Sequence, residues 1–240
     1  MLKFLSQFKE GFSFGYSGVR LIFQRDMLRW VLVPFCLSVI ICGAGLLAIG
    51  LFLYEQIDHY LGLWPSYFRN FILWFLICTL SSSISFLLFA LSNLLAAPFN
   101  SQLSAAVEYK LGNSNSSGNM GLMKSIKVGL ASMGAEIRKL SCFLKIGLPL
   151  LILTLIPGPS LFAPIAWVWF GSWMLSLEYI DYPLSNHGRD FPESKNYAAR
   201  ERGLTLGLGF ALTIITLIPL VNCVAMPAGV AAGTNFYVQK

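Results

Sequence analysis

Two arginines stand at the start of a long apolar segment, where they could help to bind an anion. Arg25 and Arg29 precede an uncharged run that begins at Trp30. The first turn of a helix has backbone N–H groups without helical partners and the positive end of the helix dipole, and both attract anions. The alternative is that the two arginines only extend their charged ends to a membrane interface. The residues of this junction are Arg25, Asp26, Met27, Leu28 and Arg29.

A second group of polar residues follows another apolar segment. Asn100, Glu108 and Lys110 come after an uncharged run that ends at Leu95. Polar groups near membrane depth cost free energy, so they are candidates for a functional role. For Glu108 the alternative is an ordinary place on the solvated face of an amphipathic helix. We therefore treat the three residues as candidates for a polar core or pore.

The polar stretch that ends at His187 does not support a metal or hydrolytic site. Glu178, Asp181 and Asn186 lie near it in the sequence, but no second histidine and no cysteine accompanies them, and zinc sites need such ligands. The sequence also has no Walker A, HExxH or GxSxG pattern. We expect no metal, no cofactor and no enzymatic activity. We interpret His187 as a hydrogen-bonding surface or loop residue, and the alternative is a proton carrier in a proton-coupled permease.

The composition is typical of a membrane protein. Hydrophobic residues make up 56% of the chain and charged residues 12%, whereas soluble domains carry about 25% charged residues. The net charge of +6 comes from scattered bases, without the basic and aromatic clusters of a nucleic-acid surface, so we expect no nucleic-acid partner. The segment 55–70 holds two acids and one base, and the positive-inside rule then places both termini in the cytoplasm.

Hydropathy divides the chain into two spans and two shorter hairpins. Each span is an uncharged run of 25 residues, which as a helix is longer than the ~30 Å hydrocarbon core. Each arm of the other two apolar regions has only about 13 to 17 residues, which favours re-entrant segments, and Pro157 or Pro219 lies between the arms. The expected elements are an amphipathic helix at 4–25, transmembrane helices at 30–54 and 71–95, cytoplasmic amphipathic helices within 100–141, hairpins at 143–177 and 204–235, and a polar loop or helix at 178–203.

The expected hairpin tips require protection from lipid. Backbone groups freed at Pro157, Gly158 and Pro219 cannot face hydrocarbon without a large cost. They must be buried in protein or line water, so we expect a pore or a homo-oligomer. Both tips follow the sequence TLIP, at 154–157 and 216–219, which is a weak internal repeat of the kind found in transporters. The alternative is coincidence in a chain rich in Leu and Ile.

Several short motifs occur in an order that resembles a known family. They are AAPFN at 96–100, LIPG at 155–158, DYPLSNH at 181–187 and IPLVN at 218–222. Together they resemble the CysZ sulfate permeases over most of the chain. The resemblance implies an all-α, multi-pass protein of the inner membrane, with two spans and two hemi-penetrating hairpins, that assembles into oligomers. It also implies insertion in both orientations, which conflicts with the expectation from the positive-inside rule.

The resemblance also implies a function and a site. Its members import sulfate for cysteine synthesis without an ATPase domain, and sulfite is a further candidate substrate. The junction before their first span reads Gly-hydrophobic-Arg-Arg, so the resemblance makes Arg25, Asp26, Met27, Leu28 and Arg29 the candidate sulfate-binding residues. Of the family's arginines, only Arg29 carries over to this chain. Asp26 replaces the glycine and should repel a dianion, while Leu28 replaces one arginine; Arg25, one turn away, could supply the lost charge. Ala106 stands where the family carries a further acid.

Three hypotheses follow from these observations. The leading one is a sulfate permease or channel that works without ATP hydrolysis and contacts only sulfate, related oxyanions, the bilayer and copies of itself. The alternative is a non-transporting membrane scaffold that organises partner proteins, which the departures at Asp26, Leu28 and Ala106 suggest. A membrane-embedded enzyme has least support, because the expected spans lack converging titratable groups.

Overall fold

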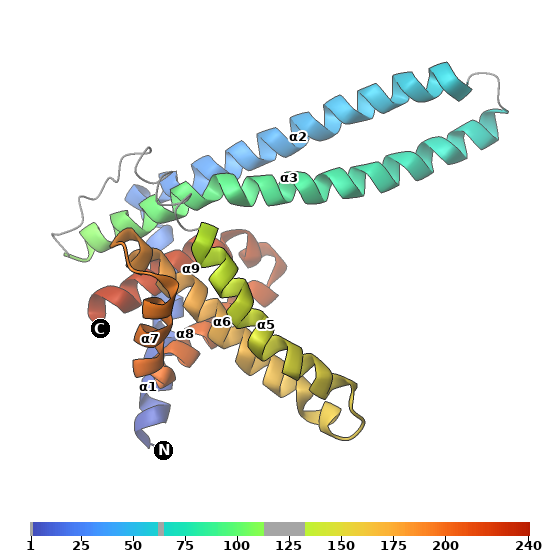
Figure 1. Cartoon of the computed structure of the whole chain (residues 1–240). Coiled ribbons are helices and arrows are strands. Elements are labelled where there is room, and N and C mark those ends of the chain that lie inside the picture. The colour runs from blue at the N-terminus through green and yellow to red at the C-terminus, as the bar shows by residue number, and fades with distance from the viewer. Residues whose placement is uncertain (1, 62–64, 113–132) are drawn as a thin grey trace. The chain divides into compact units, whose positions relative to one another are not determined.

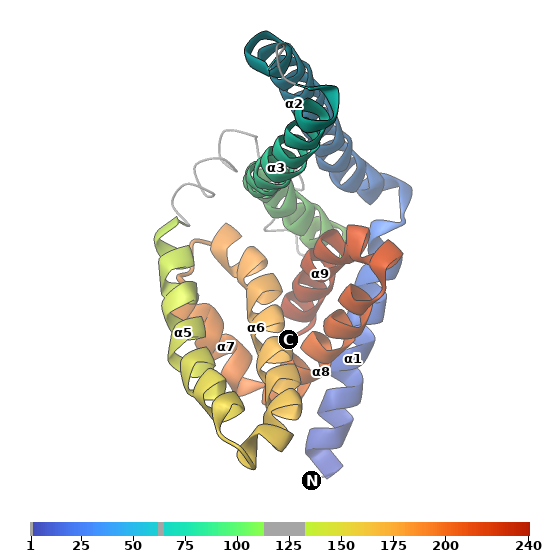
Figure 2. The same ribbon diagram turned by 90° about the vertical axis from the view of Figure 1, so that its right-hand side faces the viewer.

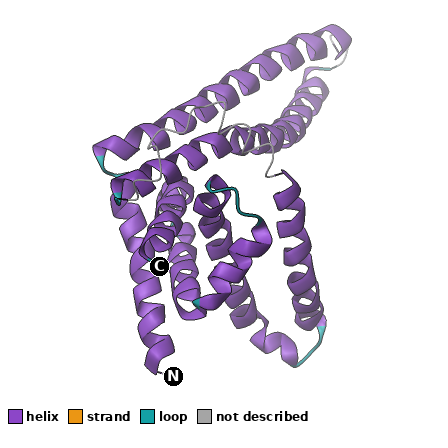
Figure 3. Cartoon of the chain, turned by 60° about the vertical axis from the view of Figure 1, so that its left-hand side comes forward, coloured by secondary structure: helices purple, strands orange, loops and turns teal. Residues whose placement is uncertain are grey.

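The computed structural model describes residues 2–61, 65–112 and 133–240, and every regular element in these ranges is a helix (Figure 3). The expectation of an all-helical chain is therefore confirmed for this part of it. The chain divides into two compact units, one made of Met1–Val31 with Pro98–Lys240 and the other of Leu32–Ala97. We refer to them as the body and the helical pair.

The helical pair is built from the greater parts of two long helices. They are α2 (Arg25–Leu61) and α3 (Ser66–Lys110), which run in opposite directions through this unit (Figure 1). Large apolar side chains such as Phe35, Leu47 and Trp74 are exposed along them. By length and composition, Arg25–Phe52 is apolar enough to cross a membrane, and Asn70–Phe86 is a shorter apolar stretch. An apolar surface of this kind suits lipid rather than water.

The body contains the remaining helices. Figure 2 shows α6 with α5 on one side and α8 and α9 on the other, and α6 contacts all three. The body's own elements are α1 (Leu2–Ile22), α5 (Met133–Leu155), the short 3₁₀ helix η1 (Pro159–Phe162), α6 (Ala163–Asn186), α7 (Phe191–Arg200), α8 (Arg202–Leu217) and α9 (Pro219–Gln239).

Helix α1 packs against α8 and α9 of the body through its glycines. A Cβ atom on Gly11 would overlap the carbonyl of Leu204 in α8, and one on Gly18 would overlap the carbonyl of Ala228 in α9. Small residues allow helix backbones to approach this closely, as they do between membrane helices. The opposite side of α1 exposes apolar residues, Tyr16 among them. That this side lies on the membrane surface stays a prediction.

Two helix breaks occur at the prolines that the sequence singles out. The first lies between α5 and α6, where Gly158 has a φ of 97°, a left-handed conformation that glycine adopts readily. The arms of this hairpin are joined near their tip by a hydrogen bond of 3.1 Å from the Trp167 indole to the Thr154 hydroxyl. The second break separates α8 from α9 at Ile218, directly before Pro219. Re-entry of either hairpin into a membrane stays a prediction.

The helix bounds differ from the expected ones in several places. Helix α3 continues through Pro98 to Lys110, so the polar residues after the expected span belong to the same helix. Helix α5 starts at Met133, and the part of the expected amphipathic region at 113–132 lies outside the described residues. Most of the expected polar segment at 178–203 is helical, as the end of α6 and as α7. A further stretch long and apolar enough to span a membrane is Pro159–Asn186, which overlaps the first expected hairpin.

Candidate functional site

The expected anion site lies at the sharp turn between α1 and α2, within the body. The carbonyl of Gln24 accepts hydrogen bonds from the backbone amides of Met27 at 2.9 Å and Leu28 at 3.1 Å, and these bonds begin α2. The amides of the two residues before them belong to the first turn, where N–H groups face outward along the helix axis. A helix therefore starts where the sequence predicts one, and that an anion binds there stays a prediction.

The five candidate side chains of this junction have different surroundings. Arg25 and Arg29 are exposed, and the guanidinium carbon of Arg29 lies 5.0 Å from the centre of the Trp30 ring, a cation–π contact. Met27 is buried and packs in the hydrophobic core, so it anchors the turn. Leu28 is half-buried. Among these five residues, the positively charged side chains are therefore the two exposed arginines.

Asp26 is paired with a cation from a distant part of the chain. The Lys110 ammonium lies 3.0 Å from the Asp26 carboxylate, and it comes from the last turn of α3. The carboxylate side chain is 74% exposed and the lysine side chain 33% exposed. This ion pair joins the two groups of candidate residues that the sequence places 84 residues apart.

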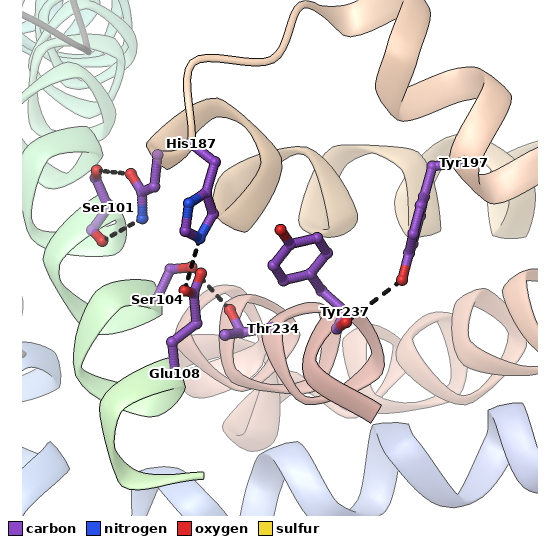
Figure 4. A network of polar contacts seen from close by, with 8 residues as sticks. Ser101, Ser104, Glu108, His187, Tyr197, Thr234 and Tyr237 are labelled. Carbon is purple, nitrogen blue, oxygen red and sulfur yellow. Dashed lines mark hydrogen bonds and ion pairs between the residues drawn. The ribbon is translucent and has the colours of Figure 1, made fainter. Parts of the chain in front are cut away.

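Glu108 belongs to a buried polar network rather than to a solvated helix face. It is 1% exposed, and its carboxylate lies 2.8 Å from Nε2 of His187, at the end of α6 (Figure 4). Burial raises the pKa of Glu108 above its ordinary value of 4.5, and the hydrogen bond to His187 offsets part of that rise. Its other oxygen, Oε1, has no protein partner. The alternative of an exposed Glu108 is therefore wrong.

The same segment of α3 carries further buried polar groups. Asn186 accepts a hydrogen bond of 2.5 Å from the Ser101 hydroxyl and donates one of 2.9 Å to the Ser101 carbonyl (Figure 4). The Asn100 and Gln102 side chains are 4% and 3% exposed, and their amide nitrogens find no protein acceptor. Buried polar atoms without protein partners usually contact water or an ion.

A hydroxyl pair extends this network to α9. The Thr234 hydroxyl donates to Ser104 at 2.9 Å, and both side chains are fully buried (Figure 4). Residues 100, 104 and 108 lie four apart and so share one face of the helix. That spacing is visible in the sequence and could have identified Ser104, whereas Ser101 and Gln102 carry no signal that distinguishes them from other polar residues.

In the part of the chain that the structure describes, no cluster of three or more His, Cys, Asp or Glu side chains could hold a metal ion. The expectation that the chain needs neither metal nor cofactor stays a prediction. The geometry that is present suits a different task. Exposed guanidinium groups at a helix start can bind oxyanions, and buried polar side chains can replace part of the hydration shell of a polar species.

Comparison with known proteins places the chain in a family. The family model described as "Sulfate transporter CysZ/Etoposide-induced protein 2.4" matches residues 16–227. The chain belongs to this family. The matched range contains the α1–α2 junction and all of the buried polar segment of α3. Membership of the CysZ family is what the sequence motifs predict, and that prediction is confirmed.

Individual relatives in the CysZ family match over nearly their whole length. A sulfate transporter CysZ of Pseudomonas aeruginosa (strain LESB58) is 34% identical over 232 residues, which cover 93% of this chain and 92% of the relative. The protein of the same name from Pseudomonas syringae pv. tomato is 33% identical over 228 residues, 93% of this chain and 90% of the relative. That from Vibrio atlanticus is 30% identical over 236 residues, with 97% and 93% covered.

Proposed function

We propose that this protein is a sulfate permease of the bacterial inner membrane. The observation that carries the proposal is the exposed Arg29 beside the first turn of α2, in a chain whose relatives are named sulfate transporters. A sulfate dianion can accept hydrogen bonds from a guanidinium fork and from the first-turn amides together. Arg25 adds a second positive charge one turn away.

We propose that the buried polar segment of α3 lies along the route of the ion. Asn100 and Gln102 hold N–H donors without protein acceptors, and such donors can replace part of the hydration shell of an anion. Glu108 faces His187 at the other end of the segment, where a carboxylate would repel a dianion unless it is protonated or paired. An ionised and unpaired Glu108 would therefore slow the passage of sulfate.

Charge placement supports a shallow insertion of the first hairpin. The segment 146–177 contains no charged residue, and it includes the tip with both flanking arms. From Ile146 to Leu155 the arm of α5 rises about 15 Å, which is half of the ~30 Å hydrocarbon core. With the tip near the bilayer midplane, Lys145 would lie at the interface, and Trp173 on α6 would lie at a similar depth.

The remaining features of the proposal follow from the family resemblance. The sequence has no nucleotide-binding motif, and we propose a passive permease or channel that uses no ATP. Its sulfate would enter cysteine synthesis, with sulfite as a further substrate. The backbone groups at the hairpin tips cannot face hydrocarbon, and Leu161 and Leu217 beside these tips are exposed. We therefore propose a multi-pass homo-oligomer in which a second copy covers the tips.

Variants of single arginines test the site. Proteoliposomes containing the Arg29→Gln variant should take up labelled sulfate at least about tenfold more slowly than wild type, because a charge-assisted contact is lost. Arg20→Gln removes an exposed arginine of α1 and should have no effect on uptake. Equal uptake by both variants and wild type would refute the site. Uptake at the level of empty vesicles by folded wild-type protein would refute the permease and support the scaffold hypothesis.

A further inference from the structure

Asp26 is the least expected residue of the proposed anion site, which lies at the junction of α1 and α2. Asp26 is separated from Arg29 by less than one helical turn, and its side chain is 74% exposed. An unpaired carboxylate in this place would repel a dianion. Coulomb's law in water gives a loss of affinity of about tenfold for a doubly charged ion at about 6 Å from such a carboxylate. Asp26 must therefore be neutralised if the junction is to bind sulfate well.

Lys110 is the cation that meets this requirement. Its ammonium lies 3.0 Å from the Asp26 carboxylate, which is a direct ion pair. The last turn of a helix favours a cation, so α3 contributes to keeping Lys110 charged and in place. The nearest acid on its own helix, Glu108, is directed to His187. The described contacts of Lys110 thus pair it with Asp26 alone.

The ion pair also leaves the junction with the full positive charge of its two arginines. With Asp26 and Lys110 cancelling each other, Arg25 and Arg29 leave a net charge of two positive units. Without Lys110 the same four positions would carry one unit. Sulfate carries two negative charges, so this difference changes its attraction to the whole junction, and the change must depend on ionic strength.

We propose that Lys110 masks Asp26 and thereby sets the affinity of the anion site at the start of α2. The proposal rests on the proposed sulfate function of that site. Lys110 neutralises the charge of Asp26 and does not itself contact the anion. Asp26 in turn makes the affinity for sulfate sensitive to any change that separates Lys110 from it, because this ion pair connects the start of α2 to the end of α3.

A double-mutant cycle distinguishes a masking lysine from a lysine that binds the anion. Sulfate binding would be measured by equilibrium dialysis with labelled sulfate on purified full-length protein in detergent. Lys110→Met exposes the charge of Asp26 and should weaken binding by about fivefold to tenfold at low salt. Asp26→Asn should strengthen binding. The double variant Asp26→Asn with Lys110→Met should bind at least as tightly as wild type, because the repelling charge is gone.

Salt dependence and a matched lysine complete the test. The effect of Lys110→Met should be large at about 0.01 M salt and small at about 1 M, where the Debye length falls from about 30 Å to about 3 Å. A loss caused by misfolding would persist at both concentrations. Lys195→Met, at an exposed position of α7, should leave binding unchanged.

The outcomes separate this inference from the proposed function. A double variant that binds as weakly as Lys110→Met would show that Lys110 contacts the anion, and the masking role would be wrong. An unchanged affinity in Lys110→Met would also overturn the inference while leaving the sulfate site in place. Wild-type protein that is folded and binds no sulfate would refute the proposed function itself.

Discussion

Replacing Lys139 with methionine should destabilise the body strongly. Lys139 lies on α5, and its ammonium is 2.9 Å from the Asp181 carboxylate and 3.3 Å from that of Glu178, both on α6. Its side chain is 12% exposed and that of Asp181 only 4% exposed. The ion pair is therefore almost wholly buried, and it joins the first arm of the hairpin to the second.

The expected loss follows from what the substitution leaves behind. Methionine keeps most of the apolar stem but removes the charge, so Asp181 remains buried without its cation. Breaking a buried ion pair in this way costs about 3–5 kcal/mol. Asp181 still accepts a hydrogen bond of 2.6 Å from the Ser194 hydroxyl, which offsets part of the loss. We therefore expect a decrease of about 3 kcal/mol in the free energy of unfolding.

The neighbouring residue provides a matched control. Arg138 pairs with Asp190 at 3.5 Å, but the two side chains are 48% and 69% exposed. Exposed pairs contribute about 0–1 kcal/mol, so Arg138→Met should reduce stability by less than about 1 kcal/mol. Both variants would be compared with wild type by denaturant unfolding in mixed micelles. Equal losses would refute the reasoning, because burial would then not decide the strength of these pairs.

Two further predictions concern helix packing and pH. Gly209→Ala should destabilise the protein by at least about 2 kcal/mol, because its new Cβ would overlap the carbonyl of Ser172 in α6. The control Gly171→Ala, whose new Cβ meets no atom within 4 Å, should be neutral or stabilising. A smaller loss of stability in Gly209→Ala than in Gly171→Ala would contradict this packing. Since burial raises the pKa of Glu108, its contribution to stability is largest below pH 4.5 and is lost as pH rises through the folded-state pKa. The amide oxygen in Glu108→Gln should accept the same hydrogen bond from His187 but cannot ionise, so the variant should lack this decline in stability. Melting temperatures of wild type and variant would be compared from pH 4.5 upward. Identical changes with pH would show that Glu108 does not cause the decline.

The first apolar span could be predicted from the sequence because its physical signal is local. A run of uncharged residues from Trp30 to Tyr54 is long enough to cross hydrocarbon, and the corresponding helix is α2. The breaks beside Pro157 and Pro219 were also predictable, since proline removes a helical hydrogen bond and crowds the preceding turn. Pro98 carries the same local signal, yet α3 continues through it. Membrane helices tolerate a proline where neighbouring groups satisfy the freed carbonyl.

The candidate site could be predicted only in part. Arg29 is found from its place before an apolar run, but the partner of Asp26 is not, because Lys110 is 84 residues away and only the tertiary fold brings it near. The burial of Glu108 depends likewise on His187, at the end of a different helix. Periodicity along one helix predicts which residues share a face, but it does not predict what that face contacts.

Sulfate flux across a sealed bilayer tests the central claim most directly. Purified wild-type protein in liposomes, with no nucleotide present, would be supplied with labelled sulfate outside and compared with empty liposomes. We expect saturable uptake that excess unlabelled sulfate or sulfite inhibits and that chloride does not. Uptake equal to that of empty liposomes, from protein shown to be folded, would contradict the account.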